Sequence, residues 1–211
     1  MTLEELMKRI HLPQAACETL WEERISEKEY KVWKDRFYQD IKQFIREWKE
    51  IDERLAWALE FYLKLAVDTY EEYQRKGYAD QVFDQTFYDI TIWCNECYKK
   101  HGVYGLEELW WLGLSVKMGL FRLGRLQFEP MLVQKDMKGE GQEILEGTKA
   151  LNVHIPAGEP LGYEECQESF DQALEFFGEE YRVFVCDSWL LSPHLQEILP
   201  DTSNIIRFQK L

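Results

Sequence analysis

The side chains best suited to move a proton lie in the second half of the chain. His154, Glu129 and Asp187 each stand at the end of an apolar stretch that is expected to form a β-strand. An imidazole titrates near neutral pH, and a carboxylate can accept a proton or hold a cation, so these residue types suit general acid–base chemistry. The hydroxyl of Ser188, beside Asp187, adds a group that can donate a proton to a leaving group.

Each of these residues also has a purely structural interpretation. His154 could be hydrogen-bonded within its domain, and Glu129 could be a solvated carboxylate that leaves a strand. Asp187 or Ser188 could cap the turn into the next helix, as these residue types commonly do. Spacing alone leaves both interpretations open.

The five cysteines indicate packing rather than chemistry. Cys94 and Cys97 have a spacing used in metal sites, but the sequence holds no second pair, and positions i and i+3 of a helical pattern share one core face. Cys186 ends an apolar run, which favours an inert buried thiol. We therefore predict no metal site and reduced thiols. A hydrolase that uses Cys186 or Ser188 as nucleophile is the weaker alternative.

Helical periodicity dominates the first half of the chain. Apolar residues recur every three or four positions over 30–48, 55–70 and 83–98, which predicts three long helices. One or two shorter helices near Pro13 precede them. A further helix, 106–117, is apolar on nearly every side and should be enclosed. We predict a helical N-terminal domain over 1–102 and a second domain over 103–211.

The second half changes to strand-like patterns. Residues 121–129 alternate, with Gly124 allowing a bulge or a close backbone contact. The other expected elements are an exposed connection at 135–148, strands at 150–155 and 182–186, helices at 163–177 and 192–199, and a last strand at 204–209. A strand, a helix and a buried strand in succession predict a parallel pair. The fold class is α+β, a helical domain followed by a mixed α/β sheet domain.

Charge and hydropathy exclude several classes of partner. A net charge of −14 with no block of Lys and Arg opposes binding to nucleic acid or to an anionic membrane surface. The apolar runs are far shorter than the ~20 residues of a membrane span, and the first residues are acidic, unlike a signal peptide. We expect a cytoplasmic protein of unknown oligomeric state whose partner is a small molecule, with a mild preference for a cationic amine.

Five stretches of sequence resemble a known family. They are YGLEELWWL at 104–112, FRLGRLQFE at 121–129, LNVHIPAG at 151–158, FVCDSWLL at 184–191 and SNI at 203–205. In these words, and in the order of its elements, the chain resembles bacterial two-domain acyltransferases, in which a helical N-acyltransferase domain precedes a GNAT-like C-terminal domain. The resemblance covers roughly half of the chain.

The resemblance implies an enzyme that transfers an acyl group from acetyl-CoA or another acyl-CoA directly to an amine. The coenzyme would lie in a splay between the parallel strands 151–155 and 182–186. The base would come from His154, Glu129 or Asp187, and Ser188 would protonate the leaving thiolate. The residues at the coenzyme would be Val153, Ile155, Ala157, Gly158 and Gly162.

The loop before the helix at Tyr163 departs from the GNAT pattern. GNAT enzymes carry Gln/Arg-x-x-Gly-x-Gly/Ala there, whereas residues 157–162 read AGEPLG, with no basic residue, an acidic Glu159, and Pro160 in place of one N–H donor. The helix N-terminus still offers free N–H groups to a pyrophosphate. The departure favours an alternative function, a non-catalytic GNAT-like module that binds a ligand or a protein.

Overall fold

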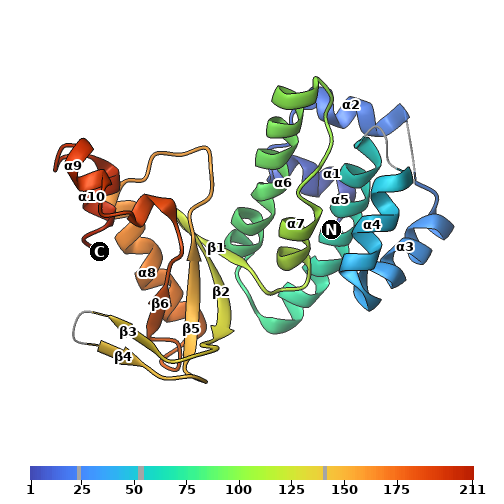
Figure 1. Ribbon diagram of the computed structural model, residues 1–211. Helices are drawn as coiled ribbons and strands as arrows, with labels where there is room; N and C mark the ends of the chain where they lie inside the picture. The colour runs from blue at the N-terminus through green and yellow to red at the C-terminus, as the bar shows by residue number, and fades with distance from the viewer. Residues whose placement is uncertain (23–24, 52–54, 140–141) are drawn as a thin grey trace. The chain divides into compact units, whose positions relative to one another are not determined.

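The computed structural model describes residues 1–22, 25–51, 55–139 and 142–211 (Figure 1). The chain divides into two units, Met1–Gly119 and Leu120–Leu211, so the division falls between 119 and 120 rather than between 102 and 103. Residues 103–119 belong with the helices because Tyr62 donates a hydrogen bond to the carbonyl of Leu109 at 2.5 Å. The Trp111 indole also donates to Asp89 at 2.9 Å.

The first unit is helical throughout and is built around one long helix. Its elements are α1 (Leu3–Arg9), α2 (Gln14–Glu22), α3 (Glu27–Gln39), α4 (Ile41–Ile51), α5 (Ala56–Lys76), α6 (Asp80–His101) and α7 (Leu109–Val116). Helix α5 contacts α1, α2, α6 and α7. Its Phe61 is fully buried and stacks on Phe44 of α4, with ring centroids 5.2 Å apart. The aromatic residues at helical spacing therefore form the core of this unit.

The segment 30–48, expected to form one helix, is broken at Asp40, where the backbone is extended (φ −151°, ψ 98°). The Asp40 carboxylate accepts hydrogen bonds from the backbone N–H groups of Lys42 and Gln43 at 2.9 and 3.0 Å, so it caps α4. The break brings Phe37 of α3 against Phe44, with ring centroids 5.4 Å apart. The prediction of a continuous helix was wrong because a cap residue lay inside the apolar pattern.

Helix α7 is shorter than expected and only partly enclosed. Leu112 and Val116 are 2% and 3% exposed, whereas Trp110 is 45% exposed. Gly113 lets α7 approach α4, because a Cβ at this position would collide with the side chain of Ile41.

The second unit is a mixed sheet covered by a helix. Its strands are β1 (Phe121–Leu123), β2 (Leu126–Leu132), β3 (Met137–Gly139), β4 (Gln142–Ile144), β5 (Lys149–His154) and β6 (Val183–Val185). The main sheet has the order β1-β2-β5-β6, and β3 and β4 form a separate ribbon within the connection expected at 135–148. Strands β5 and β6 are parallel, as predicted, with α8 (Tyr163–Phe177) between them in sequence. Helix α8 packs on β1 and β2.

Two expectations for the C-terminal part were wrong. Strand β6 is a half-buried edge strand rather than one buried on both faces. Residues 204–209, expected to form a strand, contain helix α10 (Asn204–Phe208), which packs on α8. Alternation over so few residues does not separate a strand from a short helix. Before α10 the chain forms the 3₁₀ turn η1 (Trp189–Leu191) and the helix α9 (Leu195–Ile198), which lies within the short helix expected over 192–199.

Hydropathy along the described helices gives no membrane span, since none of them combines the length and the apolar character that a crossing needs.

Candidate active site

His154 and Glu129 lie on neighbouring strands and touch each other. In the antiparallel pairing of β2 with β5, Glu129 faces Asn152 and Gln127 faces His154. The Nε2 atom of His154 lies 3.1 Å from Oε2 of Glu129, and Nδ2 of Asn152 lies 3.3 Å from the same oxygen. The side chains of His154 and Glu129 are 25% and 32% exposed, so a ligand can reach both.

The contact fixes which nitrogen of His154 can serve as a base. A carboxylate only accepts hydrogen bonds, so the nitrogen that faces Glu129 carries the proton. Nδ1 then keeps its lone pair and is the atom that can accept a proton. Asn152 also lies near Nε2, at 3.1 Å, and its amide is best satisfied by donating to Glu129. The arrangement resembles other catalytic pairs in which a carboxylate orients an imidazole and stabilises its charged form.

The strand edge expected to hold the coenzyme begins beside this pair. The register between β5 and β6 ends where Asn152 faces Val185, whereas β5 continues to His154. Val153 is 3% exposed, and Ile155, just after the strand, is half-buried. The two parallel strands therefore stop pairing at the carboxyl end of β5, which is where α/β sheets commonly bind ligands.

Ser188 and Asp187 take less direct positions. The Ser188 hydroxyl oxygen accepts a hydrogen bond from the backbone N–H of Leu190 at 3.3 Å and caps η1, which is the structural role weighed for it from the sequence. Asp187 is exposed. Burial raises the pKa of the Cys186 thiol, and the neighbouring Asp187 carboxylate raises it further. A thiol with a raised pKa is a poor nucleophile, which argues against the hydrolase that uses Cys186.

The loop before α8 is held at both ends and exposed in its middle. Residues 157–160 are exposed, while Pro156 and Leu161 are buried. Gly158 has φ +101°, a backbone conformation that favours glycine, and a Cβ there would meet open space. Gly162 is the N-cap of α8, and a Cβ there would collide with the carboxylate of Glu165.

Two buried arginines supply the positive charge that the loop itself lacks. Arg122 of β1 and Arg125 of the β1–β2 turn are only 4% and 7% exposed. Arg122 Nη2 donates to the Glu159 carboxylate at 2.8 Å. Arg125 donates from Nε to the carbonyl of Pro160 at 2.9 Å and from Nη2 to the carbonyl of Glu159 at 2.7 Å. Burial lowers the pKa of Arg125, because removal from water disfavours the charged form of the guanidinium.

The β1–β2 turn is fixed against α8, and this positions both arginines. Gly124 has φ +67°, and a Cβ there would lie 2.8 Å from the hydroxyl of Ser169 on α8. That hydroxyl accepts a hydrogen bond from the backbone N–H of Arg125 at 2.8 Å and donates to the carbonyl of Glu165 at 2.8 Å. The close contact expected at Gly124 is confirmed. The contact joins the β1–β2 hairpin to α8, the helix that follows the loop at 157–162.

The first turn of α8 carries a further ion pair. Glu164 accepts a hydrogen bond from Arg207 of α10 at 2.8 Å. The Arg207 guanidinium lies 4.9 Å from the centre of the Tyr163 ring. The helix end that would receive a phosphate is therefore bordered by both signs of charge. Helix α10, absent from the predicted topology, contributes one of them.

Sequence reasoning missed the roles of Asn152, Arg122, Arg125 and Arg207. A usable signal existed for Arg122, because a charged residue inside an apolar strand pattern needs a partner when it is buried. Asn152 could have been placed beside Glu129 only with the register of β2 and β5. Arg207 could not have been placed while 204–209 was expected to form a strand.

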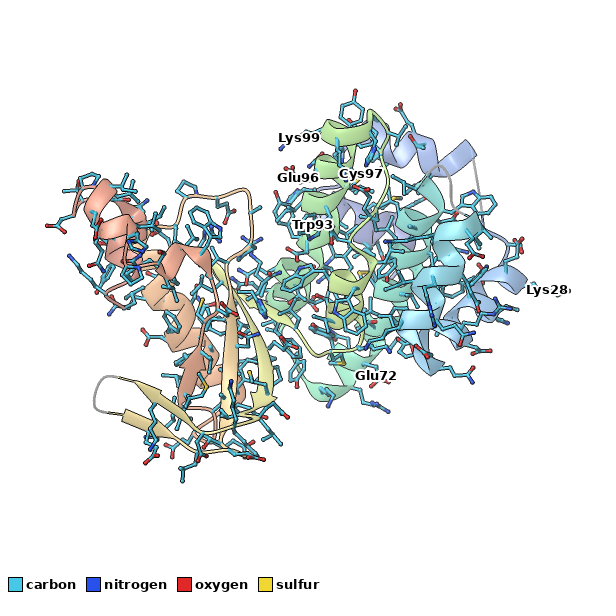
Figure 2. All side chains as sticks on the ribbon, viewed as in Figure 1. Lys28, Glu72, Trp93, Glu96, Cys97 and Lys99 are labelled. Carbon is cyan, nitrogen blue, oxygen red and sulfur yellow. The ribbon has the colours of Figure 1, made fainter. Side chains whose placement is uncertain are left out.

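Metal binding has no support within the described ranges, where no group of three or more His, Cys, Asp or Glu side chains could hold an ion. Cys94 and Cys97 lie on α6 and are 0% and 2% exposed. Cys97 is labelled in Figure 2. Burial, and to a lesser extent the neighbouring Cys97, raise the pKa of Cys94 to about 12. The pair is part of the helix core.

Comparison with known proteins gives the family. Residues 1–118 match the N-acyltransferase N-terminal domain, and residues 120–211 match the GNAT-like C-terminal domain. The chain therefore belongs to the acyltransferase family that joins these two domains, which confirms the resemblance and the α+β fold.

Solved structures of similar fold span the whole chain. An acyltransferase in complex with decanoyl-CoA and teicoplanin has a TM-score of 0.74 at 22% identity, covering 98% of this chain and 67% of its own. The values are the same for a complex with CoA and 10C-teicoplanin. A complex with decanoyl-CoA has a TM-score of 0.74 at 20% identity, covering 99% of this chain and 68% of its own. At these identities the likeness establishes the fold. No curated protein matches the chain.

Proposed function

We propose that this protein is an acyl-CoA-dependent N-acyltransferase that moves an acyl group directly from the thioester to the amine of a small molecule. The contact between His154 and Glu129, at the end of the strand where pairing with β6 stops, is the observation that carries the proposal. Family membership supports it.

In the proposed reaction the amine nitrogen attacks the carbonyl carbon of the thioester. A C–N bond forms, the C–S bond breaks, and the proton lost by the amine passes to Nδ1 of His154. Glu129 holds the imidazole at Nε2 and stabilises the imidazolium that results. Coenzyme A leaves as a thiolate, and the Ser188 hydroxyl is our candidate donor of the proton that it takes up. Solvent then carries the proton held by His154 to the Ser188 oxygen, so both side chains return to their starting state. Asp187, which is exposed, is the less suitable base.

The acyl-CoA would bind along the free edge of β5 and over the loop before α8. Its pantetheine chain would pair with the backbone near Val153 and Ile155, and its phosphates would lie at Ala157, Gly158 and Gly162. The charge that the loop lacks comes from Arg122 and Arg125 below it. Decanoyl-CoA is the donor to test beside acetyl-CoA, because solved structures of this fold contain it. The free cysteines suit a reducing, cytoplasmic setting.

The test is acyl transfer by the full chain with decanoyl-CoA and a panel of amines, followed by mass spectrometry of the product. His154→Ala should lower kcat by about 10²- to 10⁴-fold while the Kd for CoA stays within about two-fold. His194→Ala, an exposed histidine in the same unit, is the matched control.

Glu129→Gln should lower kcat less than His154→Ala, because the imidazole remains and loses only the carboxylate that orients it. Full activity of His154→Ala would remove His154 as the base. A chain that binds no acyl-CoA at millimolar concentration would not be an acyltransferase of this type.

The second candidate is a GNAT-like module that binds a ligand without catalysis. The observation that favours it is the acidic lining of the coenzyme site, where Glu159 covers Arg122 and Glu165 folds over Gly162. Tight CoA binding with no transfer to any amine, and no effect of His154→Ala, would support this candidate.

A further inference from the structure

The helical unit contains a cavity that the proposed chemistry does not use. It has a volume of about 780 Å³ and lies between α1, the end of α2, the start of α3 and α5. Cavities of ~300–1,000 Å³ are the usual size for small-molecule sites. All of its described lining residues belong to the first unit, whereas the loop before α8 belongs to the second.

One side of the cavity is apolar. Met7 of α1 and Leu20 of α2 are 6% and 5% exposed, and Ile25, just before α3, is 7% exposed. Val67 of α5 and Leu3 of α1 are half-buried and complete this wall. A short alkyl or aromatic group placed here would leave water at ~25 cal/mol for each Å² that it buries.

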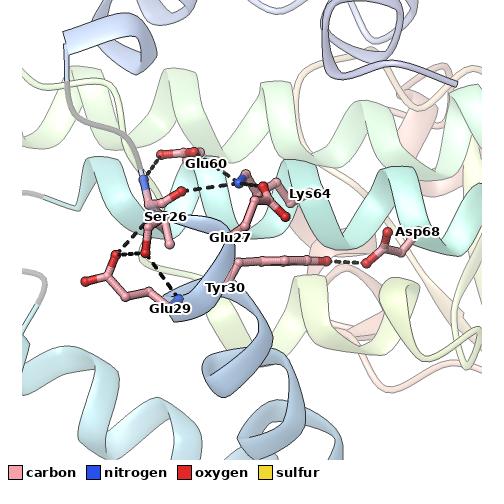
Figure 3. Close-up of polar contacts among 8 residues, drawn as sticks. Ser26, Glu27, Glu29, Tyr30, Glu60, Lys64 and Asp68 are labelled. Carbon is pink, nitrogen blue, oxygen red and sulfur yellow. Dashed lines mark hydrogen bonds and ion pairs between the residues drawn. The ribbon is translucent and has the colours of Figure 1, made fainter.

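Among the described lining residues, the other side of the cavity carries more negative than positive charge. Two carboxylates share the ammonium of Lys64, which lies 2.7 Å from Glu27 and 3.7 Å from Glu60 (Figure 3). Glu60 is only 3% exposed and accepts a hydrogen bond from the backbone N–H of Ile25 at 2.8 Å. A carboxylate oxygen can accept hydrogen bonds from more than one donor, so the carboxylates on this side offer acceptors to an ammonium group.

A third carboxylate stands at the opposite end of this wall. Asp68 accepts a hydrogen bond from the Tyr30 hydroxyl (Figure 3). It also pairs with the Lys34 ammonium at 2.6 Å. The Lys34 ammonium comes from outside the cavity, whereas Asp68 and Tyr30 line it. Burial raises the pKa of Tyr30, and its bond to Asp68 raises it further, so the phenol stays neutral and adds no charge.

We propose that this cavity binds a small amphipathic ammonium, a primary amine that carries a short apolar chain. The apolar wall of Met7, Leu20 and Ile25 takes the chain, and the carboxylates of Glu60 and Asp68 take the ammonium group. Among the described lining residues Lys64 is the only cation, which disfavours a carboxylate or phosphate ligand. The site is independent of the proposed acyl transfer.

The test is calorimetric titration of the full chain, without coenzyme, with n-octylammonium, 1-octanol and octanoate. Salt at about 0.15 M screens general attraction to the acidic surface. We expect one octylammonium per chain, bound about ten-fold more tightly than octanol, and octanoate weakest. The three ligands have similar alkyl chains and differ in the charge of the head group. The order of their affinities therefore reports the charge that the cavity prefers.

Two kinds of variant test the apolar wall and the carboxylates of the cavity separately. Val67→Trp, at a half-buried position, should fill the cavity and abolish binding of both octylammonium and octanol. Glu60→Gln should weaken octylammonium about three- to ten-fold and leave octanol unchanged. Glu71→Gln, an exposed residue of α5 outside the cavity, makes the same charge change and should alter neither ligand by more than about two-fold.

Several results would overturn the proposal. They are many weak sites in place of one, octanoate binding as tightly as octylammonium, and Glu71→Gln weakening octylammonium as much as Glu60→Gln. Circular dichroism and thermal melting check that Val67→Trp folds, and Leu3→Trp fills the cavity from α1 if it does not. Because no coenzyme is present, failure here leaves the proposed acyl transfer untouched, and failure of acyl-CoA binding leaves this site untouched.

Discussion

Neutralising Glu159 should tighten the binding of coenzyme A. The Glu159 carboxylate pairs with the Arg122 guanidinium at 2.8 Å. The Arg122 side chain is 4% exposed, whereas the Glu159 side chain is 56% exposed. A phosphate that approaches the loop meets this carboxylate before it meets the arginine. Glu159→Gln removes the repulsion and weakens the pair that the phosphate has to displace.

The magnitude follows from the exposure of the pair. An ion pair in which one partner is more than half exposed is worth ~0.2–1 kcal/mol after screening by solvent. If binding of the phosphate replaces this pair, neutralising Glu159 recovers most of that cost, so the Kd for CoA should fall about two- to five-fold, at 1.4 kcal/mol for each factor of ten. The effect should shrink as salt rises.

The assay is calorimetric titration of wild type and variant with CoA and with pantetheine, which lacks the phosphates. Glu179→Gln is the matched control, because Glu179 also pairs with an arginine, Arg182 at 3.1 Å, but follows the other end of α8. The control should leave the Kd for CoA within about two-fold of wild type.

Two results would refute the reasoning. One is a Glu159→Gln variant that binds CoA no more tightly than wild type, which would mean that Glu159 does not compete with the phosphates. The other is an equal gain for pantetheine, which would mean that the variant changes the shape of the loop rather than its charge. A protein that binds neither ligand would instead overturn the coenzyme site itself.

Further predictions concern the fold. The backbone N–H groups of α4 hold the pKa of Asp40 below its usual range, so its contribution is present above about pH 3.9 and is lost as pH falls through the lowered pKa. Asp40→Ala should therefore lower Tm at neutral pH, with the gap to wild type closing in acid, and a constant gap would contradict this. Gly105→Ala should lower the free energy of unfolding in urea by about 1–3 kcal/mol, because a Cβ there would lie 2.6 Å from the carbonyl oxygen of Leu55, whereas Gly77→Ala, in open space at φ +71°, should cost less. In thiol labelling of the native protein, Cys17 and Cys186 should react before the buried Cys94, Cys97 and Cys166, which should wait for unfolding.

The sequence predicted the fold well where the apolar pattern was long. Helices α5 and α6 and the parallel pair of β5 and β6 follow from periodicity and from the order of elements. It failed where short patterns were ambiguous, as at α10, or where a capping residue interrupted a long pattern, as at Asp40. At Asp40 a local hydrogen bond, invisible to hydropathy, decides where the helix ends. At α10 the apolar pattern is too short to separate a strand from a helix.

The candidate base could be predicted because its residue type limits the chemistry, and the pairing of His154 with Glu129 then follows from strand register. The positive charge beneath the loop at 157–162 could not be predicted in the same way. A motif search asks whether residues 157–162 contain a basic side chain, and they do not. In the folded chain Arg122 and Arg125 reach the loop from a hairpin earlier in the sequence, because Gly124 docks against Ser169. The electrostatics of a phosphate site depend on every charge that the fold brings beneath it, so a loop that departs from its family pattern in sequence can still lie over the guanidinium groups that a phosphate needs.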